Sequence, residues 1–410
     1  MGINLNKKYG LGESRHLEQK DIILLADHHK DIRLITAHHL SKRGFKNVVG
    51  VDSGMHVVEF LRNCPRHKKV GCVIAERDMP ELSGIDLLSE ISADPEMPRP
   101  PFVLTIASPS REETMLALEA GVDRVMVRPY SLNDVMHIIN EAIRLFYNPK
   151  NPERVYNLAK KETGLENFSG ARGIYRDLMD VNSNSARPAV GMALIDFKEE
   201  NYDSALAYLS EAEMRNPNFV HIFSLRGKIL MKMDQLGDSL TAYRKGIELS
   251  PLNPIRYKDV SEILLQDKRY NEIIEILTAA QARNVRFSTI DHYLSKAYFF
   301  LKQPDKAISH IKMALKIEPE NISFLNQLAI CHKQKEDYTE SIKVYNKIIK
   351  IDPGNDAILF NKSICLHAKG ETSKAIKILE RVIERNPDYR NAKRKLKEYK
   401  GQLSAPKKSA

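Results

Sequence analysis

The second half of the chain repeats itself with a period of about 34 residues, and this period constrains the fold more than any other feature. Prolines recur in register with it, at Pro217, Pro251, Pro319, Pro353 and Pro387. Val285 stands at the position of the series where a proline is missing. Proline cannot donate a backbone hydrogen bond and restricts the residue before it, so each one marks the end of a helix. The spacing predicts a series of equal helical units.

Small residues recur twice in these units, twelve residues apart. Twelve residues before each position of the proline series stand Ala205, Ser239, Ile273, Ala307, Ser341 and Ala375. Twelve residues further back stand Ala193, Gly227, Ser261, Ser295, Ala329 and Ser363. This spacing predicts two antiparallel helices whose backbones approach closely, since a larger side chain would separate them. Each hairpin leaves an apolar face that only its neighbours can cover, so the units must stack.

The pattern resembles the tetratricopeptide repeat (TPR) family, whose units have the same length, small residues at these places and a terminal proline. The resemblance implies about seven TPR-like repeats over residues 152–389, followed by a polar capping helix over 390–402. Two units depart from the pattern: Ser183 replaces the proline in the first, and Ile273 occupies a small site in the fourth. We expect these two units to pack less regularly.

The N-terminal half alternates short apolar runs with amphipathic stretches. The apolar runs lie near residues 21–26, 47–51, 71–75, 101–107 and 123–127, and the amphipathic stretches near 30–43, 54–63, 83–93, 111–120 and 131–146. Five strands that alternate with five helices predict an α/β doubly wound, five-stranded parallel sheet. In such sheets the functional residues lie at the carboxyl ends of the strands.

The residues at those ends resemble the receiver domain of two-component response regulators. The features that carry the resemblance are Asp27-His28 after the first strand, Glu76 with Met79-Pro80 and Gly84 after the third, and Arg128-Pro129-Tyr130 after the fifth. The resemblance implies a phosphorylation site made of an acceptor aspartate, an acidic pair for a divalent cation, a hydroxyl and a lysine. Here the acceptor position is Glu76, the second acid is His28, the hydroxyl position is Ile106, and the lysine is Arg128.

These replacements predict a degenerate phosphorylation site. Glu76 retains a negative charge that Arg128 can hold bidentately, which would fix the receiver in one state without phosphate. Two alternatives stay open, namely that the pair is an inert remnant, or that phosphate is still accepted, with Asp78 as the acceptor. We expect no metal and no cofactor, and we interpret His28 and His29 as surface histidines.

The TPR resemblance also predicts a partner-binding groove on the first helices of the repeats. Its inward positions carry Lys160, Phe197, Lys198, Lys228, Met231, Lys232, Lys296, Phe299, Phe300 and Lys333. Lysines beside Phe and Met would suit an extended or helical peptide with acidic and apolar side chains. The alternative, that these lysines only solvate a helix face, stays open.

The charge distribution and the absence of catalytic motifs reduce the number of possible functions further. The formal net charge is +10, but residues 390–410 hold eight Lys and Arg against one acidic residue, so the excess reflects mainly one terminus. The sequence contains no P-loop, nucleophile elbow, HExxH or paired CxxC motif, and we therefore expect no enzyme. We predict a flexible leader over 1–18, a receiver-like domain over 19–147, a short linker over 148–151 and a basic flexible tail over 403–410.

These observations together favour a cytoplasmic signalling adaptor, in which an unphosphorylated pseudo-receiver is joined to TPR units that bind a protein partner. The receiver resemblance implies a bacterial setting. One alternative is a phosphorylation-switched response regulator that gates the TPR groove. Another is a nucleic-acid binder that uses the basic tail, although nucleic acid is the less favoured partner. The apolar runs are too short to span a membrane, and the sequence leaves the oligomeric state open.

Overall fold

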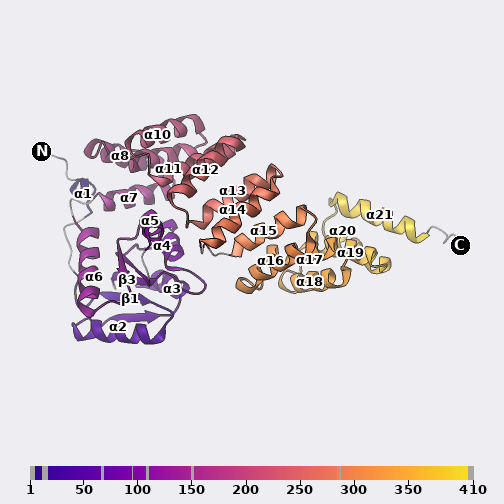
Figure 1. The fold of residues 1–410 in the computed structure, drawn as a ribbon, viewed down its shortest axis with the longest axis horizontal. Coiled ribbons are helices and arrows are strands. Elements are labelled where there is room, and N and C mark those ends of the chain that lie inside the picture. The colour runs from indigo at the N-terminus through magenta and orange to yellow at the C-terminus, as the bar shows by residue number, and fades with distance from the viewer. Residues whose placement is uncertain are drawn as a thin grey trace. The chain divides into compact units, whose positions relative to one another are not determined.

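The protein is described from a computed structural model, shown in Figure 1, which describes residues 5–11, 17–65, 69–94, 96–107, 110–148, 152–283, 285 and 288–404. The chain divides into two compact units, Met1–Leu252 and Asn253–Ala410. This division falls inside the repeat series, at the start of the unit that carries Ile273. The predicted linker lies mostly outside the described residues, as do positions 405–410 of the predicted tail, and the predicted domain limits remain predictions.

The first unit begins with an α/β region whose described residues form a five-stranded, fully parallel sheet. Its strands are β1 (Ile22–Ala26), β2 (Val48–Val51), β3 (Val70–Glu76), β4 (Phe102–Ile106) and β5 (Arg124–Val127). Their spatial order is β2-β1-β3-β4-β5. The alternating helices are α2 (Lys30–Lys42), α3 (Gly54–Asn63), α4 (Gly84–Ala93), α5 (Arg111–Ala120) and α6 (Leu132–Phe146). The predicted doubly wound sheet is confirmed.

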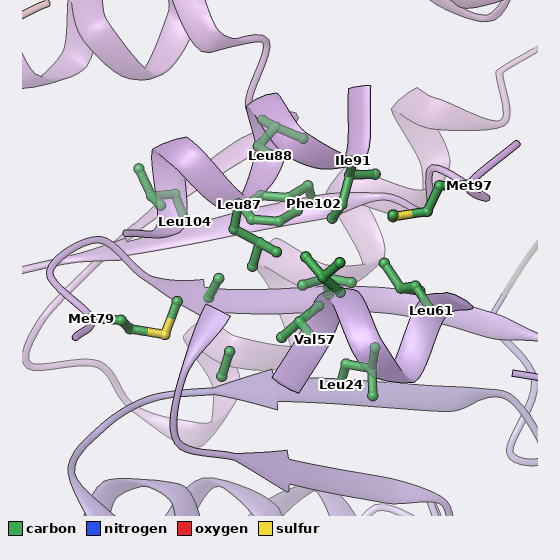
Figure 2. Packing of buried hydrophobic residues seen from close by; sticks show 14 of the residues in the cluster. Leu24, Val57, Leu61, Met79, Leu87, Leu88, Ile91, Met97, Phe102 and Leu104 are labelled. Atoms are coloured by element: carbon green, nitrogen blue, oxygen red, sulfur yellow. The ribbon is translucent and has the colours of Figure 1, made fainter. Parts of the chain in front are cut away.

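Each face of this sheet packs against its own set of helices because the strand residues alternate between two cores. Leu24 and Phe102 point to a core with Val57 of α3 and Leu87 of α4, as Figure 2 shows. On the other face, α2 and α6 pack on a second set of strand residues through side chains that include Leu40 and Ile139. Burying both faces explains why the central strands are continuous apolar runs.

Helical hairpins follow in both units. In the first unit they are α7 (Glu153–Gly164) with α8 (Phe168–Val181), α9 (Arg187–Lys198) with α10 (Tyr202–Arg215), and α11 (Val220–Lys232) with α12 (Leu236–Leu249). In the second unit they are α13 (Pro254–Gln266) with α14 (Tyr270–Ala282), α15 (Ser288–Phe300) with α16 (Pro304–Ile317), α17 (Ile322–Gln334) with α18 (Tyr338–Ile351), and α19 (Asp356–Ala368) with α20 (Thr372–Arg385).

The predicted close contacts within the hairpins are confirmed. The small residues of both series are fully buried, Ala307 and Ala329 among them. A side-chain Cβ at Gly227 would lie 2.6 Å from the ring of Tyr243, so a larger residue there would require the ring to shift. A serine at the second-helix site also donates a hydrogen bond to the carbonyl twelve residues earlier, over 2.7 Å from Ser239 to Gly227. This bond gives the buried hydroxyl a partner, so serine is tolerated at a position that alanine also occupies.

The turn inside each hairpin repeats a backbone conformation that the sequence period does not reveal. One residue per turn has a positive φ, at Glu166, Glu200, Asp234, Lys268, Lys302, Glu336 and Gly370. Glycine, the residue best suited to this left-handed conformation, stands at one of these places only. The hairpin geometry therefore imposes the conformation on six side chains that disfavour it.

The described part of the predicted leader contains the short helix α1 (Leu5–Lys8), whose Leu5 is buried against α7 and α8. Lys8 pairs with Asp177 over 2.5 Å, and the Tyr9 hydroxyl donates to the same carboxylate. The apolar Leu5 and the acceptor Asp177, far apart in sequence, together hold α1 against the first hairpin. The flexible leader over 1–18 stays a prediction. Residues 1–4 and 12–16 of the leader lie outside the described part.

At the other end, the expected capping helix is present as α21 (Arg390–Ser404). Its Ala392 and Tyr399 are buried against α20, where Leu379 lies. The polar remainder of α21 faces solvent, as a capping helix requires. In the described part of the chain, no helix combines the length and the apolar character needed to cross a membrane.

Candidate functional site

Two buried carboxylates lie at the carboxyl ends of the central strands. Asp27 follows β1 and Glu76 ends β3, and β1 and β3 are paired in register from Ile23 onward. The two residues are only 2% and 7% exposed. The chain order reverses between β1 and β3, which is where doubly wound sheets place their functional residues.

The loop after β3 fixes the position of Glu76. Gly84, the first residue of α4, donates its backbone N–H to the carbonyl of Arg77 over 2.9 Å. A Cβ at Gly84 would collide with the carbonyl oxygen of Glu76. Ser83 caps α4 by accepting a hydrogen bond from the backbone N–H of Asp86. The close approach that glycine permits therefore holds the end of β3 against the start of α4.

Arg128 bridges both carboxylates. Its Nη1 donates to Glu76 Oε1 over 2.7 Å, and its Nη2 donates to Asp27 Oδ2. The same Nη2 lies 3.3 Å from the hydroxyl of Thr105 on β4. The predicted bidentate pair between Arg128 and Glu76 alone is therefore wrong, because the guanidinium spans the two strand ends. The Arg128 guanidinium therefore lies between the two buried carboxylates.

The adjacent histidines close the pocket from the side of α2. His28 Nδ1 lies 2.5 Å from Glu76 Oε2, and His29 Nδ1 lies 3.2 Å from Asp27 Oδ1. The backbone N–H of His29 also donates to Asp27 Oδ1 over 2.8 Å. Both imidazoles remain partly exposed, at 37% and 50% of the side chain. They are surface residues as predicted, but they are bound to the buried carboxylates.

The charges of the pocket are coupled. Burial would raise the pKa of Glu76, but Arg128 and the hydrogen bonds within the cluster lower that pKa below its ordinary value. Burial raises the pKa of Asp27, more than its backbone hydrogen bond with His29 and the charge of Arg128 lower it. Two carboxylates that share one guanidinium titrate as a pair. Of the two, Glu76 is the one whose ionised form is favoured.

The pocket does not fit the Mg²⁺ that the receiver resemblance implies. Mg²⁺ prefers an octahedron of oxygen ligands and keeps several waters. Here Arg128 already binds one oxygen of each carboxylate, and imidazole nitrogens face the other oxygens. The aspartate that would supply further oxygen is replaced by His28. No phosphoryl-transfer step through Mg²⁺ is therefore derived for this protein.

The other predicted receiver positions, Ile106 and Asp78, lie outside the cluster around Glu76. Ile106 is 3% exposed and packs in the core, so it offers no hydroxyl. The carboxylate of Asp78 is turned towards Arg77, which donates to it over 2.9 and 2.7 Å. Asp78 is 70% exposed and does not belong to the cluster around Glu76.

The predicted groove residues fall into both units. Lys160, Phe197, Lys198, Lys228, Met231 and Lys232 belong to the first unit, and Lys296, Phe299, Phe300 and Lys333 belong to the second. In the first unit the lysines are exposed, whereas Phe197 packs against the core of its hairpins. In the second unit Phe299 also packs against the hairpin core, while Phe300 is 47% exposed.

Two residues of the pocket, Thr105 and His29, could not be assigned to it from the sequence pattern. Thr105 supplies a hydroxyl beside Arg128, one position before the expected Ile106, and it pairs with Glu76 in the sheet. His29 contacts Asp27, although adjacent histidines give no pattern of their own. The alternation of side chains along β4 could have directed attention to Thr105. No local signal identifies His29.

The fold and this pocket define a class: a receiver domain followed by an array of tetratricopeptide repeats. Residues 23–140 match the profile described as response regulator receiver domain, and residues 332–396 match a tetratricopeptide repeat. The chain belongs to the response-regulator receiver family through its N-terminal domain. Receiver domains and TPR arrays are typically non-catalytic signalling and interaction modules.

Particular relatives are chemotaxis proteins. The receiver domain is 31% identical over 109 residues to chemotaxis protein CheY-3 of Vibrio cholerae, covering 27% of this chain and 81% of the relative. It is 28% identical over 109 residues to chemotaxis protein CheY1 of Helicobacter pylori, covering 27% and 86%. A TPR structure from Cytophaga hutchinsonii is similar with a TM-score of 0.49 and 18% identity, covering 58% of this chain and 97% of that chain.

Proposed function

We propose that this protein is a signalling adaptor whose receiver domain works without phosphate and whose TPR array binds a protein partner. The observation that carries the proposal is the bridge from Arg128 to Asp27 and Glu76. In this pocket a built-in cation lies where the receiver resemblance implies a metal ion and an acyl phosphate. The domain would therefore hold one state constitutively, and the chain would transmit a signal by assembly rather than by phosphorylation.

The first unit offers the clearest surface for an acidic partner. Lys228 and Lys232 lie one helical turn apart on α11, and both are exposed. Residues four apart share one helix face, so the two ammonium groups lie side by side. Lys198 ends α9 and is also exposed. These lysines support a peptide ligand with acidic side chains, whose binding weakens with salt.

The second unit offers a more apolar surface. Phe300 stacks on Tyr270, with ring centroids 4.9 Å apart and planes 9° apart. Lys296 lies over the ring of Tyr293 at 5.1 Å. Burial lowers the pKa of Lys296, and the nearby Glu262 opposes this shift. Because Lys296 is already engaged within the array, Phe300 is the stronger contact residue of this unit.

The proposal can be tested with the full chain immobilised and exposed to extract from its host. We expect the wild type to retain a specific protein, and the variant Lys198→Glu/Lys228→Glu/Lys232→Glu to lose it. A control with the same charge change places glutamate at Lys245, Lys312 and Lys316 on second helices. Equal capture by the wild type and the first variant would reject the lysine surface.

The contribution of the receiver domain to partner binding needs a separate variant. Glu76→Gln keeps the size of the side chain but removes the charge that binds Arg128. If the charged bridge sets the signalling state, Glu76→Gln should reduce partner affinity while the circular dichroism spectrum stays unchanged. Unchanged affinity would reduce the receiver domain to a scaffold and leave the TPR array as the functional part.

A further inference from the structure

The pocket at the ends of β1 and β3 gathers four side chains of metal-ligand type. One ligand atom each from Asp27, His28, His29 and Glu76 lies within 4.8 Å of the others. The carboxylates are buried and the imidazoles are partly exposed, so the cluster is fixed on one side and open to solvent on the other. This cluster differs from a group of surface acids, since half of its donors are imidazole nitrogens.

The two oxygens of each carboxylate contact different partners. Arg128 holds Asp27 Oδ2 and Glu76 Oε1, while Asp27 Oδ1 faces His29 and Glu76 Oε2 faces His28. The arginine therefore leaves one oxygen per carboxylate on the side of the histidines. A hydrogen bond to the outer oxygen is also what orients ligating carboxylates in known metal sites.

The distances on the histidine side suit a small ion. His29 Nδ1 lies 3.2 Å from Asp27 Oδ1, one of the two oxygens that Arg128 leaves on this side. Two donors of a tetrahedral ion, each about 2.0–2.1 Å from it, lie about 3.3 Å apart. His28 Nδ1 is closer to Glu76 Oε2, at 2.5 Å, because a hydrogen bond joins the two atoms. Rotation of the half-exposed imidazole would open this gap.

The donor set selects the class of ion. Two imidazole nitrogens and two carboxylate oxygens suit zinc and the neighbouring divalent transition metals, whereas Mg²⁺ prefers oxygen and water. Two carboxylate charges balance the ion, and Arg128 leaves the cluster with a single excess positive charge. His28 stands where the family has an acidic residue. This replacement changes which metal ion the pocket prefers but does not abolish metal binding.

We propose that Asp27, His28, His29 and Glu76 form a binding site for a divalent transition metal such as Zn²⁺, with Arg128 as the positioning residue. Binding would replace the hydrogen bond between His28 and Glu76 by two coordinate bonds, and the Nδ1 proton of His28 would move to Nε2 through solvent, so that the neutral imidazole coordinates through Nδ1. The site revises the sequence prediction of no metal. It does not depend on partner binding by the repeats.

The test is calorimetric titration of the metal-stripped full chain with Zn²⁺ and, separately, with Mg²⁺. We expect one tight Zn²⁺ equivalent and far weaker Mg²⁺ binding. His28→Gln/His29→Gln should weaken this Zn²⁺ equivalent by about 100-fold or more, since even outer partners of metal ligands contribute about 10–100-fold. The matched control is His38→Gln/His39→Gln, an adjacent histidine pair on α2 outside the cluster, which should bind as the wild type does.

A second readout keeps the proposal falsifiable if the histidine variant folds poorly. Co²⁺ added to the wild type should give visible absorption bands of a tetrahedral site, and one equivalent of Zn²⁺ should remove them. Glu76→Gln should weaken both effects. The proposal is overturned if Zn²⁺ binds the wild type and the His28/His29 variant equally, if the His38/His39 control loses the same site, or if Mg²⁺ competes on equal terms.

Discussion

The receiver domain and the helical repeats both depart from their family patterns, but the departures fall on different kinds of residue. In the receiver domain they fall on the side chains that would carry phosphoryl transfer, such as Glu76 and Arg128, and both cores of the sheet stay intact. In the repeats the departure at Ile273 falls on a packing position, and the side chain is still fully buried. The comparison shows that the pattern of buried apolar residues preserves a fold, whereas a few polar side chains decide the chemistry of the domain.

The largest expected effect tests whether the receiver pocket depends on its built-in cation. Arg128→Met would leave the buried Asp27 and Glu76 without their cation and should reduce the free energy of unfolding by about 3–5 kcal/mol. The control Arg62→Met breaks an exposed pair with Glu90, 3.3 Å apart, and should cost less than about 1 kcal/mol. Urea denaturation of both variants makes the measurement. Similar small losses would mean that the bridge is weak.

The second prediction concerns His292, a histidine that is buried, unlike those of the pocket. His292 in α15 is 6% exposed, and within the described part of the chain its Nδ1 has no hydrogen-bond partner. Burial and, secondarily, Lys296 lower the pKa of His292 to about 4. In the unfolded chain a histidine has a pKa of about 6.5. The stability gained by keeping His292 neutral is therefore present above that pH and is lost as the pH falls towards 4.

This titration should remove about 2–3 kcal/mol of stability between pH 7 and pH 4.5. Acidic residues also titrate in this range, so the quantity to measure is the difference between the wild type and His292→Leu. We expect the variant to lose less stability over the same interval. Parallel pH profiles for the two proteins would show that His292 is not buried in its neutral form.

The third prediction tests close packing in the repeats, where stability depends on the size of a side chain and not on its charge. Ala307→Leu in α16 should lower the free energy of unfolding by about 1–3 kcal/mol, the usual cost of overpacking a buried contact. Met313→Leu in the same helix is the control, since Met313 is 47% exposed and should change stability by less than about 0.5 kcal/mol. Identical melting curves for the two variants would contradict the assignment of Ala307 to the helix contact.

Much of this architecture is predictable because it depends on local periodicity. The regular recurrence of prolines and small residues places the hairpins, and alternating apolar runs place the strands at the correct positions. The bridge of Arg128 from Glu76 to Asp27 is not predictable in this way, since it depends on side-chain directions at three strand ends. The same holds for His29 and for the packing of Leu5, because no short-range pattern specifies contacts between residues distant in sequence.

The smallest expected effect separates backbone conformation from packing in the repeats. Gly370 has a φ of +92° in a hairpin turn, and Gly237 lies in the first turn of α12; a Cβ at either would meet no atom within 4 Å. Gly370→Ala should destabilise by about 1 kcal/mol because alanine disfavours a positive φ. Gly237→Ala should stabilise by about 0.5–1 kcal/mol. Changes of the same sign in thermal denaturation would contradict the assigned turn conformation.

The central claim is that the receiver domain works without phosphate, and intact-mass measurement after incubation with acetyl phosphate and Mg²⁺ tests it most directly. The account predicts that the wild-type chain gains no phosphoryl group. Glu76→Asp alone should also gain none, because His28 and Arg128 remain, whereas His28→Asp/Glu76→Asp/Arg128→Lys restores the residue types of the family and is the variant that could gain one. A stable phosphoryl group on the wild type, at Asp78 or elsewhere in the domain, would contradict the account.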